Sequence, residues 1–161
     1  MGGIRGINHI AFAVKDLDES IKSTVEILGG ELIVKFESTA QKYIGACIQW
    51  GGHIISFLQA TDESSFVARH IEERGVGVQH IGLTIDNLDA YVKELERKGV
   101  RVDKTDMANE KFKEALVGPK TGNGIVLQLM EWKEGPMDVS PEGKERLKQK
   151  YRETPGLRLM E

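Results

Sequence analysis

A short sequence pattern that occurs twice constrains the fold of this chain more than any other feature. The first copy is INHIAFAVKDLDESI at residues 7–21, and the second is VQHIGLTIDNLDAYV at residues 78–92. In each copy a histidine, His9 or His80, lies in an alternating pattern typical of a strand, and a turn and a helix follow. Such self-similarity indicates a duplicated unit. Because pseudo-symmetry can bring equivalent positions of two repeats together, we expect the two histidines to share one site.

The hydrophobic pattern predicts the same order of elements, βαβββ, around each copy. The first module covers about residues 4–61 and the second about residues 76–132, with a linking helix at about 64–74. In the first module we expect strands at 7–14, 31–36, 43–50 and 53–59 and a helix at 17–28, whose apolar face consists of Leu17, Ile21, Val25 and Leu28. In the second we expect strands at 78–85, 100–104, 115–117 and 125–131 and a helix at 88–98. Residues 1–132 are therefore predicted to form one α+β domain.

The C-terminal extension, residues 133–161, is richer in charged residues and proline than the rest of the chain. Ser140-Pro141-Glu142 is a typical helix start, so we expect a short helix that ends at about Tyr151. Three arrangements are open for this extension: it packs across a neighbouring subunit, lies over the mouth of a cavity, or is solvated.

Composition excludes several classes of protein. The net charge is −3 with both signs spread along the chain, which gives no basic surface for nucleic acid. No apolar run approaches the roughly 20 residues of a membrane span, and the first residues lack the apolar stretch of a signal peptide. The single cysteine, Cys47, cannot form an internal disulfide. We therefore expect a cytoplasmic protein that binds a small molecule.

Two further polar residues occupy equivalent places in the last strand of each repeat. Ser56 and Gln128 are 72 residues apart, close to the histidine spacing, and each lies in an apolar strand where a buried polar group needs a partner. With His9 and His80 they predict a four-point metal site, because imidazole and amide oxygen can both bind divalent ions. The alternative is that each histidine is a hydrogen-bonded core residue. The set has no carboxylate, so an ion there would bind weakly or depend on an anionic substrate.

The two histidine strands and the segment GPKTGNGIVLQL at residues 118–129 resemble the vicinal oxygen chelate superfamily, which includes glyoxalase I, extradiol dioxygenases and methylmalonyl-CoA epimerase. The resemblance covers residues 4–132 and is strongest for the epimerase family. It implies a glyoxalase-like fold in which paired βαβββ modules form a curled mixed sheet around a cavity, usually in a homodimer. It also implies a divalent metal at His9 and His80, with Co, Ni, Zn, Mn and Fe as candidates.

The carboxylates of the epimerase family are missing at the matching positions. Gln128 stands where the family has a Glu on the final strand, and the middle strand of the first module, YIGACI at residues 43–48, offers no carboxylate. Epimerisation needs two proton-transferring groups on opposite faces of the α-carbon. The family's second ligand position corresponds to Ser56, or to Ile55 if the following loop has no gap. Glu131 is the nearest carboxylate, but its odd offset from Gln128 puts it on the opposite face of the strand unless a bulge resets the register.

Three functions are compatible with this sequence. The first is a metal-dependent isomerase, epimerase or lyase that acts on a small carboxylic acid or acyl-CoA thioester through a metal-stabilised enolate, with Glu131 as the candidate proton carrier. The second is a non-catalytic protein that sequesters a small molecule, in an apolar pocket lined by Phe12, Trp50, Phe57 and Met130. The third, a dioxygenase, needs two histidines and a carboxylate around iron. The resemblance favours the enzyme, although a fold does not by itself determine a function.

Overall fold

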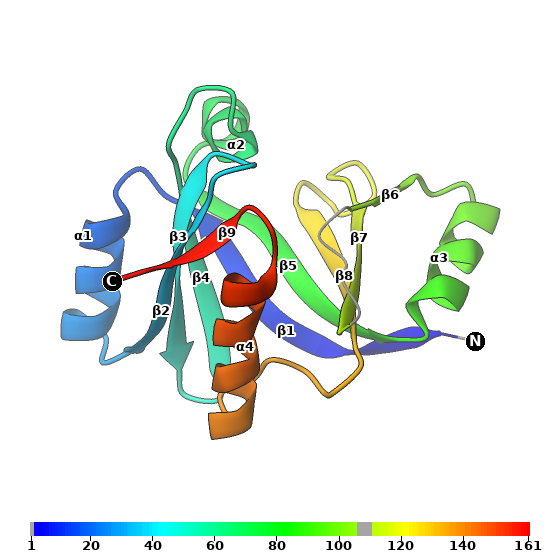
Figure 1. The fold of residues 1–161 in the computed structure, drawn as a ribbon. Helices are drawn as coiled ribbons and strands as arrows, with labels where there is room; N and C mark the ends of the chain where they lie inside the picture. Colours follow the sequence, from blue (N-terminus) through cyan, green and yellow to red (C-terminus); the bar gives the residue numbers. More distant parts are fainter. Residues whose placement is uncertain (1, 106–110) are drawn as a thin grey trace. The chain divides into compact units, whose positions relative to one another are not determined.

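The computed structural model describes residues 2–105 and 111–161, which form two compact units. One unit consists of residues 1–9 and 80–136, and the other of residues 10–79 and 137–161. Each unit combines helices with β-strands, which confirms the predicted α+β class (Figure 1). No helix within the described ranges is long and apolar enough to cross a membrane.

Each strand and helix that the sequence pattern predicts is present, with small shifts at its ends, and the structure adds a strand near the C-terminus. In chain order the elements are β1 (Gly3–Ala13), α1 (Leu17–Lys22), η1 (Ser23–Ile27), β2 (Glu31–Ser38), β3 (Tyr43–Trp50), β4 (His53–Ala60), α2 (Phe66–Arg74), β5 (Gly77–Asp86), α3 (Leu88–Arg97), β6 (Val102–Lys104), β7 (Phe112–Val117), β8 (Val126–Trp132), α4 (Pro141–Glu153) and β9 (Leu157–Met160).

In the unit of residues 1–9 and 80–136, the strand order is β6-β7-β8-β5-β1. β5 runs parallel to β8, whereas β7 is antiparallel to both β8 and β6. One face of this sheet packs against α3. The buried residues of that interface are Leu83, Ile85, Leu88, Val92, Ala115, Val117 and Leu129. Because side chains alternate along a strand, His80, Glu114 and Gln128 belong to the opposite face.

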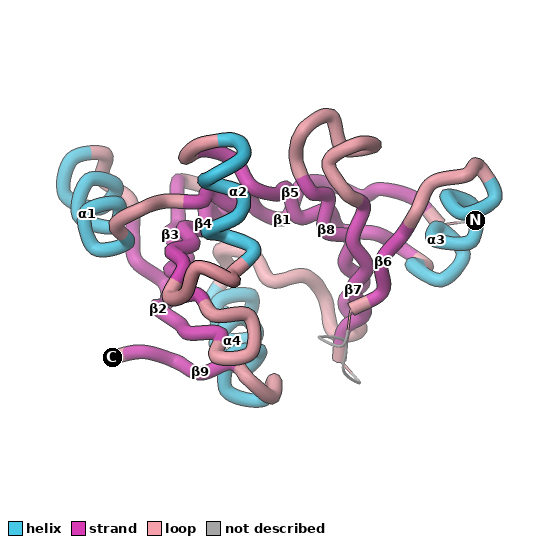
Figure 2. The backbone as a smooth tube through the Cα atoms, turned by 90° about the horizontal axis from the view of Figure 1, so that it is seen from above, coloured by secondary structure: helices cyan, strands magenta, loops and turns pink. Residues whose placement is uncertain are grey.

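In the unit of residues 10–79 and 137–161, the strand order is β1-β4-β3-β2-β9, and β2, β3 and β4 are antiparallel neighbours. α1 covers one face, where Leu17 contacts a core that contains Ala46, Ile48, Ile55 and Phe57. α4 lies on the opposite side of β2–β4 from α1 (Figure 2).

The C-terminal extension packs on its own chain. Tyr151 of α4 stacks on Phe36 of β2 with ring centroids 4.0 Å apart, and both Tyr151 and Leu147 are buried. β9 pairs antiparallel with β2, and Arg158 of β9 forms an ion pair with Glu37. Of the three arrangements left open by the sequence, the solvated one is therefore wrong, because α4 has an apolar side that the sheet of its own unit buries.

The predicted helix at 17–28 changes its geometry at Ser23. Asp16 caps α1, but residues Ser23–Ile27 form a π-helical turn, with a hydrogen bond of 3.3 Å from the Leu28 amide to the Ser23 carbonyl. A π turn contains more residues than an α turn, so each following side chain points in a new direction. Leu28, predicted to lie on the apolar face, is instead 62% exposed.

Candidate functional site

The two repeat histidines meet, as the duplication predicts. The Nε2 atoms of His9 on β1 and His80 on β5 are 3.0 Å apart, and the rings are edge to face with an interplanar angle of 89°. Both residues belong to the unit of residues 1–9 and 80–136. The ring nitrogens therefore face one another at hydrogen-bond distance.

Asn8 fixes the tautomer of His9. Its side-chain oxygen lies 2.9 Å from His9 Nδ1, and an amide oxygen can only accept a hydrogen bond. His9 Nδ1 therefore donates to Asn8, and in the neutral imidazole the other ring nitrogen, Nε2, is an acceptor beside His80 Nε2. Metal-binding histidines commonly have this arrangement, in which the distal ring nitrogen donates to a neighbouring acceptor.

Gly82 provides the space in which the His9 ring lies. A Cβ atom at this position would lie 2.4 Å from His9 Cε1, 2.5 Å from His9 Nδ1 and 2.9 Å from the Met130 side chain. Any residue larger than glycine would therefore displace the imidazole. Gly82 is the repeat counterpart of Ala11, which makes it a position that the sequence repeat could have flagged.

Gln128 lies beside this glycine and is held by a carboxylate. In the parallel ladder of β5 and β8, Gln128 is the partner of Gly82. Its Nε2 donates a hydrogen bond of 2.7 Å to Glu114 Oε2, and Glu114 Oε1 accepts one of 2.9 Å from Thr105 Oγ1. Gln128 Oε1 is buried and has no hydrogen-bond partner among the described residues. Of the predicted ligands, this side chain is the one with an unsatisfied acceptor atom.

Glu114 is the residue that sequence reasoning missed. Its exposed fraction is 8%, and no other Asp or Glu among the described residues is buried. The sequence pattern starts the strand at residue 115, whereas β7 begins at Phe112 and places Glu114 on the same face as Gln128. The available signal is the alternation of residues 112–117, in which a Glu lies between the apolar residues Phe112 and Leu116.

Glu131, the predicted proton carrier, is a residue of β8, and its carboxylate lies beside the N-terminus of α3. Its Oε2 accepts a hydrogen bond of 2.8 Å from the Leu88 amide, so the carboxylate satisfies a free donor at the helix N-terminus. The ladder between β7 and β8 runs in continuous register from Phe112 to Val117, with no bulge to turn Glu131 to the other face. The side chain is thus on the face of β8 that faces α3.

Ser56 lies in a buried cluster of the other unit. Its hydroxyl is 3.4 Å from the Cys47 thiol, which is 3.8 Å from the Tyr151 hydroxyl of α4. Burial raises the pKa of the Cys47 thiol, opposed by its hydrogen bonds to these two hydroxyls. The alternative residue for this position, Ile55, packs in the core beneath α1.

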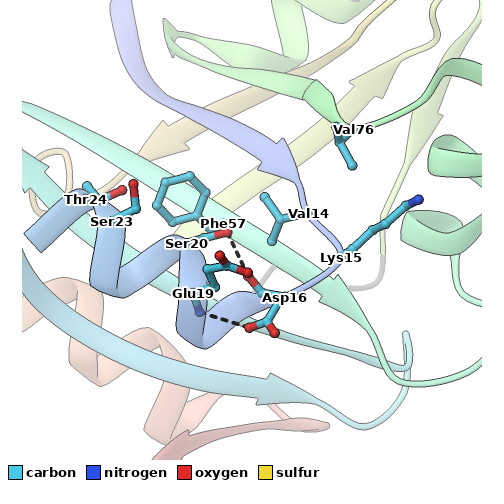
Figure 3. Close-up of a pocket in the computed structure, with 9 residues that line it drawn as sticks. All are labelled: Val14, Lys15, Asp16, Glu19, Ser20, Ser23, Thr24, Phe57 and Val76. Atoms are coloured by element: carbon cyan, nitrogen blue, oxygen red, sulfur yellow. Dashed lines mark hydrogen bonds between the residues drawn. The ribbon is translucent and has the colours of Figure 1, made fainter. Parts of the chain in front are cut away.

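Each unit also has a pocket. One of about 440 Å³ lies beside α1 and η1, and Figure 3 shows the Phe57 ring next to side chains of η1. Its lining residues are Val14, Lys15, Asp16, Glu19, Ser20, Ser23, Thr24, Phe57 and Val76. The second, of about 420 Å³, lies beside α3 and β7 and is lined in part by Lys93, Lys104, Lys113 and Glu114. Neither pocket is lined by His9 or His80.

The histidine pair suits a divalent transition metal, although it lacks a direct carboxylate. The two Nε2 atoms lie 3.0 Å apart, and histidine nitrogen is a common ligand of divalent transition metals. The buried Oε1 of Gln128 is a suitable oxygen ligand. Within the described part of the chain, no three His, Cys, Asp or Glu side chains cluster as a metal site. The residues that would hold an ion here offer two imidazole nitrogens and one amide oxygen and no carboxylate.

The chain is similar in sequence to several known proteins. Residues 8–116 match the Glyoxalase/Bleomycin resistance protein/Dioxygenase superfamily. A probable chloroplastic lactoylglutathione lyase of Arabidopsis thaliana is 25% identical over 131 residues, which cover 81% of this chain and 34% of that protein. Human mitochondrial methylmalonyl-CoA epimerase is 22% identical over 126 residues, which cover 76% of this chain and 72% of that enzyme. The chain thus spans about a third of the length of the plant lyase.

Solved structures share the fold. Methylmalonyl-CoA epimerase from Mycobacterium tuberculosis superposes with a TM-score of 0.67 and 27% identity, covering 80% of this chain and 88% of that one. A Streptomyces coelicolor methylmalonyl-CoA epimerase variant in complex with 2-nitronate-propionyl-CoA gives a TM-score of 0.72 at 24% identity, covering 81% and 99%. The latter likeness is evidence for the fold alone.

Proposed function

This chain belongs to the Glyoxalase/Bleomycin resistance protein/Dioxygenase superfamily, and we propose that it is a metal-dependent isomerase, epimerase or lyase. Its substrate is a small carboxylic acid or an acyl-CoA thioester, and the reaction removes a proton from the carbon next to a carbonyl group. The observation that carries the proposal is the 3.0 Å approach of the His9 and His80 Nε2 atoms, with the tautomer of His9 set by Asn8.

His9, His80 and Gln128 would hold the ion, which can be Co, Ni, Zn, Mn or Fe. A divalent ion at this place would polarise the substrate oxygens as a Lewis acid and so stabilise an enolate. The chain itself orients the His9 imidazole, through Asn8 and through the space above Gly82. We leave Ser56 out of this ligand set because its hydroxyl is buried against the Cys47 thiol.

The choice of substrate rests on the relatives. Methylmalonyl-CoA epimerase occurs among both the sequence relatives and the solved structures. An acyl-CoA thioester with an acidic α-carbon is therefore the first substrate to assay. Glu131, our candidate for proton transfer from the sequence, would have to release the Leu88 amide to act. A homodimer and a cytoplasmic location remain predictions.

A binding protein on the same fold is the second candidate function. The pocket beside η1 favours it, because it combines the buried ring of Phe57 with the side chains of Ser20, Ser23 and Thr24 (Figure 3). Its volume of about 440 Å³ is in the range of small-molecule sites. In this function the protein would sequester a ligand without turnover.

The first experiment measures divalent metal in the purified, untagged protein by elemental analysis. Wild type is compared with a His9→Ala/His80→Ala variant and with His53→Ala, which removes an exposed histidine outside the pair. We expect one ion per chain in wild type and His53→Ala and none in the double variant. Metal-loaded protein should then exchange deuterium at the α-carbon of methylmalonyl-CoA. If the wild type binds no metal after reconstitution with Co, Ni, Zn, Mn or Fe, the enzyme proposal is wrong and the sequestering function takes its place.

A further inference from the structure

Glu114 is a buried carboxylate that has no role in the proposed function. Within the described residues its oxygens receive hydrogen bonds from Gln128 and Thr105, both neutral donors. A buried carboxylate is costly unless hydrogen bonds or an opposite charge compensate it. Lys93, Lys104 and Lys113 line the same pocket as Glu114, so what ties its carboxylate to the histidine site is the hydrogen bond to Gln128.

The carboxylate also determines which way the Gln128 amide points. An ionised carboxylate only accepts hydrogen bonds, so the amide atom 2.7 Å from Glu114 Oε2 must be the Nε2 donor. The ladder partner of Gln128 on β7 is Leu116, and its partner on the other side, on β5, is Gly82. With Nε2 held by Glu114, Oε1 is the amide atom left for another partner. That oxygen has no partner among the described residues.

We propose that Glu114 is a positioning residue, which holds Gln128 Oε1 as an acceptor for a divalent cation. The cation claim rests on the proposed function. The orientation of the Gln128 amide does not, because its hydrogen bond to Glu114 exists without any ion.

The first test measures the NMR resonance of the Gln128 side-chain amide in the metal-free protein. The Gln128 side-chain amide is assigned in a ¹H–¹⁵N correlation spectrum by its loss in Gln128→Met. We expect Glu114→Gln to move this resonance, and Glu96→Gln to leave it in place, because Glu96 lines the same pocket as Glu114 without contacting Gln128. An unmoved resonance in Glu114→Gln overturns the positioning role, whether or not the protein binds metal.

The second test measures the affinity of each variant for Co²⁺ or Zn²⁺ by calorimetric titration. Removal of a residue that supports a metal ligand typically weakens binding about 10-fold to 100-fold, and we expect that loss in Glu114→Gln but not in Glu96→Gln. In a Gln128→Ala background, Glu114→Gln should weaken binding much less, because a residue that acts through Gln128 cannot act when it is absent. Equal losses in both backgrounds would contradict the proposal.

A reciprocal exchange keeps the test valid if Glu114→Gln is unstable. The double variant Glu114→Gln/Gln128→Glu preserves net charge, composition and the hydrogen bond between the two side chains. It also places the carboxylate at position 128, so we expect metal affinity at least equal to that of wild type. A folded exchange variant with the weakened binding expected for Glu114→Gln alone would refute the role assigned to Glu114. If wild type binds no metal, the proposed function fails, and the amide spectrum alone decides the positioning role.

Discussion

Gly82→Ala should remove metal binding without changing any proposed ligand. The added Cβ would lie 2.4 Å from His9 Cε1, whereas carbon atoms in contact are normally about 3.5–4.0 Å apart. The imidazole must therefore move by about 1 Å or more. Because the clash is with the far end of a side chain, we expect His9 to swing away and lose the 3.0 Å approach to His80.

The expected energies follow from that displacement. Overpacking a core typically costs about 1–3 kcal/mol, and release of the His9 ring keeps the cost near the lower end. Loss of one of two nitrogen ligands should reduce metal affinity far more than stability. Urea unfolding measures the first quantity, and titration with Co²⁺ or Zn²⁺ measures the second.

Gly6→Ala is the matched control, because Gly6 is on the same strand as His9 and has open space where a Cβ would go. It should bind metal like wild type and unfold within about 1 kcal/mol of it, with a small gain from the lower chain entropy of alanine. The reasoning is refuted if Gly82→Ala is folded and binds metal with wild-type affinity. Equal losses of binding in both variants would also refute it, because they would trace the effect to the sheet rather than to the His9 ring.

Three further predictions concern groups outside the histidine pair. Glu131→Gln should cost about 0.5–2 kcal/mol in urea unfolding, because the Leu88 amide loses a charged acceptor at a helix start; loss of activity at unchanged stability would instead favour the proton carrier. The native Cys47 thiol should resist iodoacetamide until the protein is denatured. Because burial raises its pKa, its contribution to folding is complete at neutral pH and falls as the pH rises above about 9, which a Cys47→Ala variant should not show. Tyr151→Ala should lower the free energy of unfolding by about 3 kcal/mol through loss of the stack on Phe36, and a change below about 0.5 kcal/mol would mean that α4 does not depend on it.

The hydrophobic pattern predicted those strands well that pair with a strand close to them in the sequence. β3 has the predicted bounds of 43–50, because it alternates cleanly and is joined to β4 by Gly51-Gly52, of which Gly51 has φ of 55°. β9 was not predicted, since its four residues become a strand only by pairing with β2, more than a hundred residues earlier. The π turn at Ser23–Ile27 likewise has no marker such as proline in the sequence.

The candidate site was predictable to the extent that it follows from the duplication. Symmetry identified His9 and His80 and suggested Gln128, because equivalent positions of repeats occupy equivalent places in the fold. The hydrogen bond between Gln128 and Glu114 joins neighbouring strands and breaks that symmetry, so no spacing rule could reveal it. Ser56 shows the converse: the repeat assigns it a place equivalent to Gln128, but the later α4 brings Tyr151 against its neighbour Cys47.

The division of the chain into compact units does not follow the division into repeats. The first repeat contributes residues 1–9 to the unit that contains the second repeat's helix α3, so both histidines are found in one unit although each repeat encodes one of them. A gene for one repeat would therefore encode half of a histidine pair, and an ancestral single-repeat protein would have needed two copies of itself to assemble it. Fragments 1–75 and 76–161, expressed apart, should each lack strands of both units and should recover the pair only when mixed.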